Sequence, residues 1–282
     1  MSGTRTLSYC AAEVRRFDPD RYLCALFAPP GRREDVFALY AFNVEIARTR
    51  ESVSEPMLGM VRLQWWRDAI AGIYGGTPPR HEVVFALAAA VANLGLPRAP
   101  FDRLIDTRER DLDDAPPATL AALEDYADGV SGELTRLALQ ALGAGGEAVL
   151  EAGRHVGIAW ALSGLLRSVP FHAQSRRCTL PADLMAARGV SAEDVFAGRF
   201  GAGMGAVAAA VAAAAAGHLR AARERRREVP RAALAAMLPA CLAGGDLKRL
   251  GRMGYNVFDP RLAAAGVGRK LRVVAHAALG RY

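Results

Sequence analysis

Cysteine is scarce in this chain of 282 residues, and its placement excludes two kinds of protein. The four cysteines, Cys10, Cys24, Cys178 and Cys241, show neither pairing nor the close spacing of a metal site. A secreted domain held by disulfides and a zinc-binding module are therefore excluded. Free thiols suit a reducing compartment, so we expect a cytoplasmic protein.

Long hydrophobic runs are also missing. Residues 1–16 contain no apolar stretch that could serve as a signal peptide. Residues 201–217 are the longest weakly polar run, but this run is short and consists almost wholly of alanine and glycine. A membrane-spanning helix needs about 20 predominantly apolar residues. We therefore interpret the run as a core helix and expect a soluble protein or one peripheral to a membrane.

Lysine is nearly absent, and arginine supplies almost all of the positive charge. Lys and Arg number 36 against 29 Asp and Glu, which gives a net charge of +7. Such a surface favours phosphate, anionic lipid or nucleic acid, although a coding bias would also spread arginines along the chain. No nucleic-acid-binding motif accompanies them, so nucleic acid is excluded as a partner. The dense group at 220–227 fits either an anionic membrane surface or a solvated helix end.

Strand-like alternation is absent, and apolar residues recur at helical spacing along the chain. Helices are predicted around residues 37–44, 58–73, 83–94 and 101–112, and longer ones over 120–142, 147–169 and 204–228. The second should stop at Gly75 and Gly76 and the third at Gly95, and Ser191 with Asp194 predicts a capping box at a further helix start. On the second of these helices, Trp65 is expected in the core, whereas Trp66 suits either the core or a partner contact. No linker or repeat divides the chain, so we predict one all-α domain over residues 1–282.

Five segments carry motifs in a specific order and spacing. They are Leu39–Glu51 with Tyr-Ala-Phe, Arg62–Pro78 with Trp-Trp-Arg-Asp, Leu104–Leu112, Tyr126–Glu133, and Gly157–Pro181, which ends in Leu-Pro. Together they resemble the squalene/phytoene synthase superfamily over residues 21–199, and residues 200–282 resemble it more loosely. The resemblance implies the single-domain isoprenoid synthase helical bundle.

The resemblance also shows what this chain has lost. In the enzymes, aspartates on two helices hold Mg²⁺, which neutralises the diphosphate leaving group and requires hard oxygen ligands. At the corresponding positions this chain has Ala47, Arg48 and Glu51 on the first helix, and Ser168 and His172 on the second. The resemblance therefore implies that both metal clamps are absent. We predict no catalytic residue, no bound metal and no cofactor.

Pro170 stands between the two degenerate positions of the second helix. A proline inside a helix removes one hydrogen bond and costs about 3 kcal/mol. We therefore expect the helix to break or kink here, so that Ser168 and His172 need not point inward.

Five arginines lie at or beside the former metal positions: Arg48, Arg50, Arg167, Arg176 and Arg177. Guanidinium groups bind phosphate in a bidentate manner, so these side chains are candidates for holding a diphosphate or a phospholipid headgroup. The alternative is that they lie on the surface and pair internally with Glu45 and Glu51.

Two further groups of residues have ordinary structural interpretations. The acidic residues at 106–114 alternate with Arg108 and Arg110 and are typical of a solvated helix end. His155 and His172 have no histidine or cysteine at ligand spacing, so a structural role is expected for both.

The departures from the enzyme pattern resemble those of a non-enzymatic branch of the superfamily, which includes the mitochondrial respiratory complex I assembly factor. This resemblance implies a role in assembling NADH:quinone oxidoreductase at the inner membrane, with complex I subunits or assembly intermediates as partners, and with a lipid or prenyl chain as a candidate ligand. One alternative is a Mg²⁺-dependent prenyl transferase that condenses two prenyl diphosphates head to head. Another is a lipid-binding protein that accompanies a true synthase.

Overall fold

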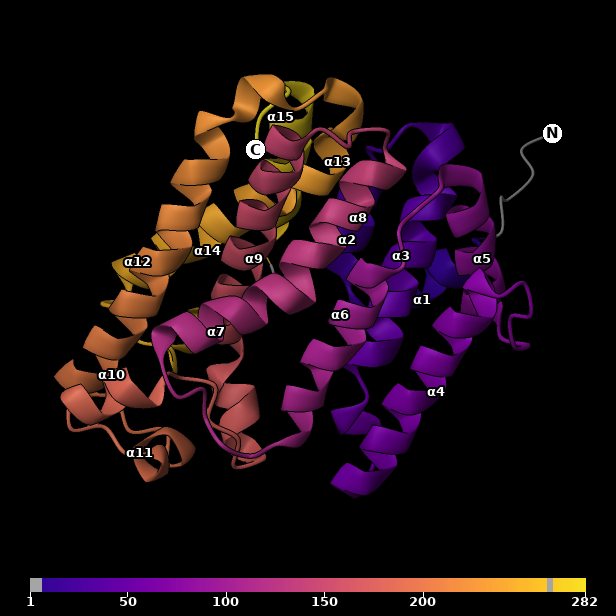
Figure 1. Cartoon of the computed structure of the whole chain (residues 1–282). Coiled ribbons are helices and arrows are strands. Elements are labelled where there is room, and N and C mark those ends of the chain that lie inside the picture. Colours follow the sequence, from indigo (N-terminus) through magenta and orange to yellow (C-terminus); the bar gives the residue numbers. More distant parts are fainter. Residues whose placement is uncertain (1–6, 263–265) are drawn as a thin grey trace.

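The computed structural model describes residues 7–262 and 266–282, and within these ranges every regular element is helical (Figure 1). This confirms the all-α prediction. The α-helices are α1 Tyr9–Phe17, α2 Pro19–Ala25, α3 Arg33–Ala47, α4 Pro56–Tyr74, α5 Glu82–Leu94, α6 Ala99–Arg108, α7 Leu120–Ala127, α8 Glu133–Ala141, α9 Glu147–Gln174, α10 Ala182–Ala187, α11 Ala192–Phe196, α12 Ala202–Glu224, α13 Leu234–Met237, α14 Pro239–Arg252 and α15 Val267–Ala278. Short 3₁₀ turns used below are η2 Arg50–Ser52, η3 Glu109–Leu112 and η5 Arg226–Glu228.

Helix α9 is the axis of the bundle, and other helices surround it (Figure 1). Its first half, which includes Val156 and Trp160, packs into a large apolar core with α1, α3, α5 and α8. Its second half, which includes Leu162, Leu166 and Val169, packs into another core with α7 and α12. The helix therefore joins the two cores, and its middle turns lie where they meet.

The predicted ends of several helices agree with the structure. Helix α4 stops before Gly75 and Gly76, and α5 stops at Gly95, whose φ of +61° suits glycine. At α11, Ser191 and Asp194 form the predicted capping box. These signals are local in the sequence, which is why they could be predicted.

The predicted helix over 120–142 has an unforeseen interruption. A buried π-helical turn, η4 (Asp128–Gly132), separates α7 from α8. Glycine on the neighbouring α9 permits this geometry, because a Cβ at Gly157 would collide with the backbone of Ser131 and Gly132. The turn thus depends on close contact with α9 rather than on local propensity.

Of the break or kink predicted at Pro170, the break does not occur. Helix α9 continues through Pro170 to Gln174. Val169 and Ala173 on either side of the proline are buried in the second core. We attribute the continuity to this packing, which offsets the hydrogen bond that proline cannot make.

Helix α12 is the apolar run considered from the sequence. By length and composition alone, α12 could cross a membrane, but its row of buried residues, such as Val207 and Val211, packs against α9 and supports the core-helix interpretation.

The expectation for Trp65 is wrong, because its side chain is 39% exposed, whereas Trp66 is fully buried. Trp66 packs edge-on against Phe42.

Candidate functional site

A cavity with two chambers lies along α9. The first chamber is bounded by α7 and the C-terminal ends of α3 and α6, and the second by the start of α2 and by η4. The first chamber has a volume of about 480 Å³ and the second about 400 Å³. Arg108, Tyr126 and Leu165 line both chambers, so the two chambers are neighbours that share this wall. Ala47, Glu51 and His172 line the first chamber and Ser168 lines the second. The cavity therefore holds four of the five positions that the resemblance assigns to metal-binding aspartates.

Asp111 in η3 is the buried carboxylate of the first chamber. One of its oxygens accepts hydrogen bonds from the Tyr126 hydroxyl at 2.7 Å and from the Arg177 guanidinium at 2.7 Å. Its other oxygen accepts from Arg108 at 3.0 Å. Burial alone would raise the pKa of Asp111, but the two arginines outweigh it and hold this pKa below its ordinary value. Asp111 is therefore ionised and fully engaged by protein groups.

The two arginines and the tyrosine form one connected group around this carboxylate. Arg108 donates to the Tyr126 hydroxyl as well as to Asp111, and burial raises the pKa of Tyr126 well above its ordinary value. Tyr126 is therefore a neutral hydrogen-bond donor. The Nε of Arg108 is buried and has no hydrogen-bond partner among the described residues. Two arginines, one ionised aspartate and one neutral tyrosine give the group one more positive charge than negative.

The first degenerate motif does not form a carboxylate clamp. Helix α3 ends at Ala47, and the guanidinium of Arg48 stacks over the Phe17 ring at 3.6 Å from its centre. Glu51 lies beyond the helix in η2, where its exposed side chain lines the first chamber. Glu45, the other carboxylate of this segment, pairs with Arg62 at 2.5 Å.

The second degenerate motif faces the cavity, contrary to the orientation expected from Pro170. Ser168 lines the second chamber, and its hydroxyl donates to the Leu165 carbonyl at 3.2 Å. His172 lines the first chamber, where burial and the nearby Arg177 lower the pKa of His172 to about 4. The imidazole is thus neutral at physiological pH. Neither side chain supplies the anionic oxygen that Mg²⁺ prefers.

No cluster of three or more His, Cys, Asp or Glu side chains that could hold a metal ion occurs in the described residues. The acidic residues at 106–114 are instead compensated by arginines from elsewhere. Arg67 binds both Asp106 and Glu109, and Arg50 binds Asp114 at 2.5 Å. The interpretation of this stretch as a solvated helix end is therefore incomplete, because Asp111 is buried.

The five candidate anion-binding arginines are dispersed, and each has a contact within the protein. Arg50 and Arg177 line the first chamber and Arg167 the second, whereas Arg176 binds Glu193 on α11 at an exposed position. The carboxylate partners in the structure are Asp114, Asp111, Asp246 and Glu193, not the Glu45 and Glu51 considered from the sequence. The structure therefore brings only part of the predicted set together.

Sequence reasoning missed a second ionic group beside the cavity. Arg167 binds Asp246 at 2.9 Å, and Arg269 binds Asp246 at 2.5 Å and Asp20 at 2.8 Å. Both guanidinium groups lie within 6 Å of the Trp160 ring, at 5.7 and 5.8 Å. These residues come from α2, α9, α14 and α15, so no local spacing in the sequence could reveal the group.

His155 is not isolated, contrary to the expectation. Its Nδ1 lies 2.7 Å from Nδ1 of His218 on α12, whose Nε2 lies 3.0 Å from Glu124 on α7. Glu151 approaches the other ring nitrogen of His155 at 3.4 Å. The four side chains link three helices outside the cavity, which agrees with a structural role.

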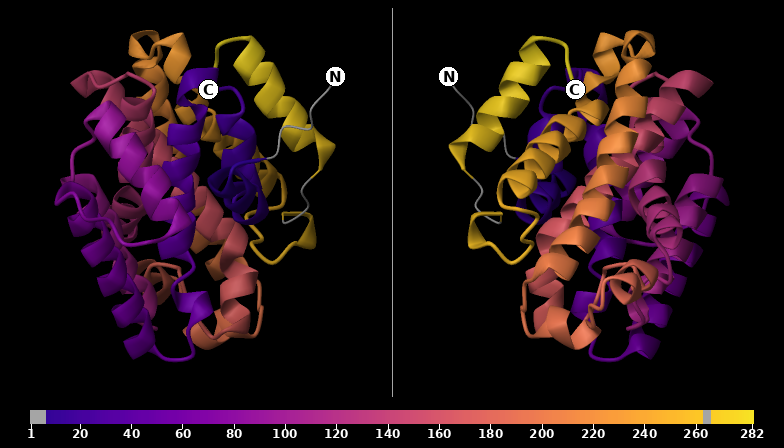
Figure 2. Two further views of the ribbon diagram at one scale, coloured as in Figure 1. Left: turned by 90° about the vertical axis from the view of Figure 1, so that its right-hand side faces the viewer. Right: turned by 90° about the vertical axis from the view of Figure 1, so that its left-hand side faces the viewer.

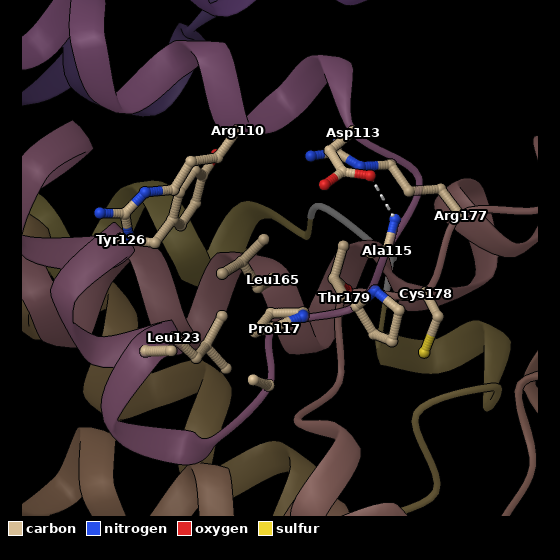
Figure 3. Close-up of a pocket in the computed structure, with 13 residues that line it drawn as sticks. Arg110, Asp113, Ala115, Pro117, Leu123, Tyr126, Leu165, Arg177, Cys178 and Thr179 are labelled. Atoms are coloured by element: carbon tan, nitrogen blue, oxygen red, sulfur yellow. Dashed lines mark hydrogen bonds between the residues drawn. The ribbon is translucent and has the colours of Figure 1, made fainter.

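A third pocket of about 320 Å³ adjoins the cavity (Figure 3). It shares Tyr126, Leu165 and Arg177 with the first chamber. Its walls are otherwise largely apolar and include Leu123 and Pro117. An apolar chain of modest length could enter here with a polar end near Arg177.

Fold and site together define a class of protein: a helical bundle of the isoprenoid synthase type whose buried cavity carboxylate, Asp111, is paired with arginines. The chain belongs to the squalene/phytoene synthase family, since the model of that family matches residues 14–267.

The relatives with the higher identity are assembly factors. The chain is 35% identical to NADH dehydrogenase (ubiquinone) complex I, assembly factor 6 of Mus musculus, over 90% of this chain and 76% of that protein. The human protein of the same name is 34% identical over the same shares of the two chains. A presqualene diphosphate synthase of Rhodopseudomonas palustris is 30% identical over 61% of this chain and 62% of that enzyme.

Solved structures confirm the fold. A dehydrosqualene synthase matches with a TM-score of 0.83 and 20% identity over 96% of this chain and 94% of that one. Squalene synthase HpnC from Alicyclobacillus acidocaldarius matches with a TM-score of 0.79 and 21% identity over 88% and 93%. The bundle is therefore common to enzymes and to this chain, and the cavity residues must indicate the function.

Proposed function

We propose that this protein is a non-catalytic factor in the assembly of respiratory complex I. The observation that carries the proposal is the state of the cavity. Asp111, its buried carboxylate, is engaged by Arg108, Arg177 and Tyr126, and the aspartate positions of the second motif hold Ser168 and His172. The identity to complex I assembly factors over 90% of the chain supports the same conclusion.

The charge balance of the cavity opposes the catalytic alternative. Ionising an allylic diphosphate requires metal ions that neutralise the leaving group. A divalent metal ion entering the first chamber would meet the positive charges of Arg108 and Arg177. Both oxygens of Asp111 between them already accept hydrogen bonds from an arginine or from Tyr126. Glu51 is left as the remaining carboxylate in this wall, and one exposed carboxylate is a weak Mg²⁺ site.

The proposed partners follow from the relatives and from the pockets. The protein acts on complex I subunits or assembly intermediates and works from the cytoplasm at the inner membrane as a peripheral protein. A lipid or prenyl chain is a further proposed ligand, with the apolar pocket beside Arg177 as its place (Figure 3). Under this proposal the cavity needs no cofactor and no Mg²⁺.

The test is deletion of the gene in the organism that encodes this chain. We expect assembled complex I and its NADH:quinone oxidoreductase activity to fall, with subcomplexes accumulating on native gels, and the intact gene to restore them. Glu51→Gln should restore them as well, because under this proposal the exposed Glu51 side chain in the chamber wall holds no metal. Normal complex I in the deletion strain, together with loss of a prenyl product, would refute the proposal in favour of an enzyme.

A further inference from the structure

Helix α15 is fixed to the bundle by one of its faces. Arg269 binds Asp20 on α2 and Asp246 on α14, and Val273 is fully buried. The side chain of Arg272 lies against Gly245 of α14, at a place where a Cβ would collide with it. Figure 2 shows α15, the yellow helix near the C-terminus, on the outside of the bundle. Its orientation is therefore defined, and its opposite face is exposed.

The exposed face of α15 is apolar. Val267 is 73% exposed, Leu271 is 62% exposed and Val274 is 48% exposed. Together with Ala278 these residues recur at i, i+4, i+7 and i+11, so they form one stripe along the helix. Leu279, which follows the helix, is also exposed. Packing in the bundle does not account for this stripe.

The flanks of the stripe carry positive charge and no negative charge. Residues 266–282 contain no Asp or Glu, and the exposed Lys270 and Arg281 border the stripe. A short helix with an apolar face and cationic flanks is typical of segments that lie in the interface of a membrane. An acidic face would be expected to exclude an anionic surface, and this segment has none.

Further cations surround the C-terminal end of α15. Arg223 donates to the Tyr282 carbonyl at 3.2 Å and Arg226 to the Gly280 carbonyl at 3.2 Å, which places the end of α12 and η5 next to it. Three more arginines of this group are exposed: Arg220, Arg225 and Arg227. The acidic residues among them are Glu224 and Glu228. Some arginines of the 220–227 group thus bind carbonyls at the end of α15, and the others face solvent.

We propose that the face formed by α15 and the 220–227 arginines docks onto an anionic lipid bilayer, with Val267, Leu271 and Val274 inserted among the headgroups. Apolar burial and attraction to anionic lipid act together in such a contact. This inference deepens the membrane location contained in the proposed function by naming the surface and the lipid chemistry.

The exposed apolar face of α4 provides a contrast within the same chain. Leu58 and Val61 are 50% and 62% exposed, which matches the α15 residues. However, Arg62 next to them is paired with Glu45, and Glu55 and Asp68 add negative charge to the same helix region. This face lacks the cationic flanks and serves as a control.

The experiment is cosedimentation of the full chain with vesicles of phosphatidylcholine, alone or mixed with anionic phosphatidylglycerol. We expect binding to the mixed vesicles that weakens with added salt, and much weaker binding to phosphatidylcholine alone. The double variant Leu271→Ser/Val274→Ser should bind the mixed vesicles about tenfold more weakly, because it loses apolar area that the bilayer would bury. Lys270→Glu should also weaken binding about tenfold. Leu58→Ser/Val61→Ser should bind like the unmodified chain.

Three results would overturn the inference: no binding to the anionic vesicles at low salt, equal binding to both kinds of vesicle, or unchanged binding by the α15 double variant. All variants alter exposed side chains, so their thermal unfolding should match the unmodified chain. Vesicle binding needs no complex I. A deletion strain with normal complex I would refute the proposed function alone, whereas failure on vesicles would refute the membrane surface alone.

Discussion

The substitution Asp111→Asn most sharply tests the ion pairing inside the cavity. The side chain of Asp111 is 7% exposed, and its oxygens take hydrogen bonds from Arg108, Arg177 and Tyr126. Asparagine has nearly the same shape but no charge, so it leaves two largely buried guanidinium groups without their counter-ion. Breaking a buried ion pair in this way costs about 3–5 kcal/mol. We expect a loss of that size in the free energy of unfolding.

The assay is urea denaturation, in which the midpoint should fall while the slope stays unchanged. The matched control is Asp125→Asn. Asp125 pairs with Arg110 at 2.8 Å, but its side chain is 55% exposed, so its loss should cost less than about 1 kcal/mol. If Asp111→Asn left the protein as stable as before, or stabilised it, the reasoning would fail.

Three further predictions concern packing, pH and the docking of α15. Gly157→Ala should lower the free energy of unfolding by about 1–3 kcal/mol, because its Cβ meets backbone of the π turn. Gly164→Ala on the same helix meets nothing within 4 Å and should raise it by about 1 kcal/mol, and opposite signs in thermal denaturation are the check. Since the pKa of His172 is lowered to about 4, the unfolded chain binds more protons, and stability present above pH 6.5 should decline as pH falls from 6.5 to 4. His172→Gln should reduce this decline by about 2 kcal/mol after allowance for solvent screening, and an identical pH profile would contradict the assignment. Asp246→Asn should loosen Arg269 and speed amide exchange in α15, and unchanged exchange there would show that apolar packing alone holds the helix.

The extent to which the molecule could be predicted from its sequence depends on the range of the interactions involved. The ends of α4 and α5 and the capping box of α11 follow from neighbouring residues, and they were predicted. The π turn was not, because it requires Gly157 on α9 to come within contact of Ser131. The error at Pro170 has the same origin, since tertiary packing outweighs a local penalty.

The cavity shows the same division. The degenerate positions Ser168 and His172 could be found from the motif, and the structure places both at the cavity. The role of Asp111 could not be found, because Arg177 lies 66 residues away in the sequence. The partners of the arginines could not be predicted for the same reason, since Arg167 binds Asp246, 79 residues away in the sequence. Charges near a motif do not identify their partners.

The measurement that most directly tests the central claim is diphosphate release from farnesyl diphosphate and geranylgeranyl diphosphate by the purified chain, with and without Mg²⁺. The account predicts no release above the protein-free rate in either condition, from protein that unfolds cooperatively. Release that depends on Mg²⁺ and disappears in Glu51→Gln would contradict it, because that result requires a working metal site in the first chamber.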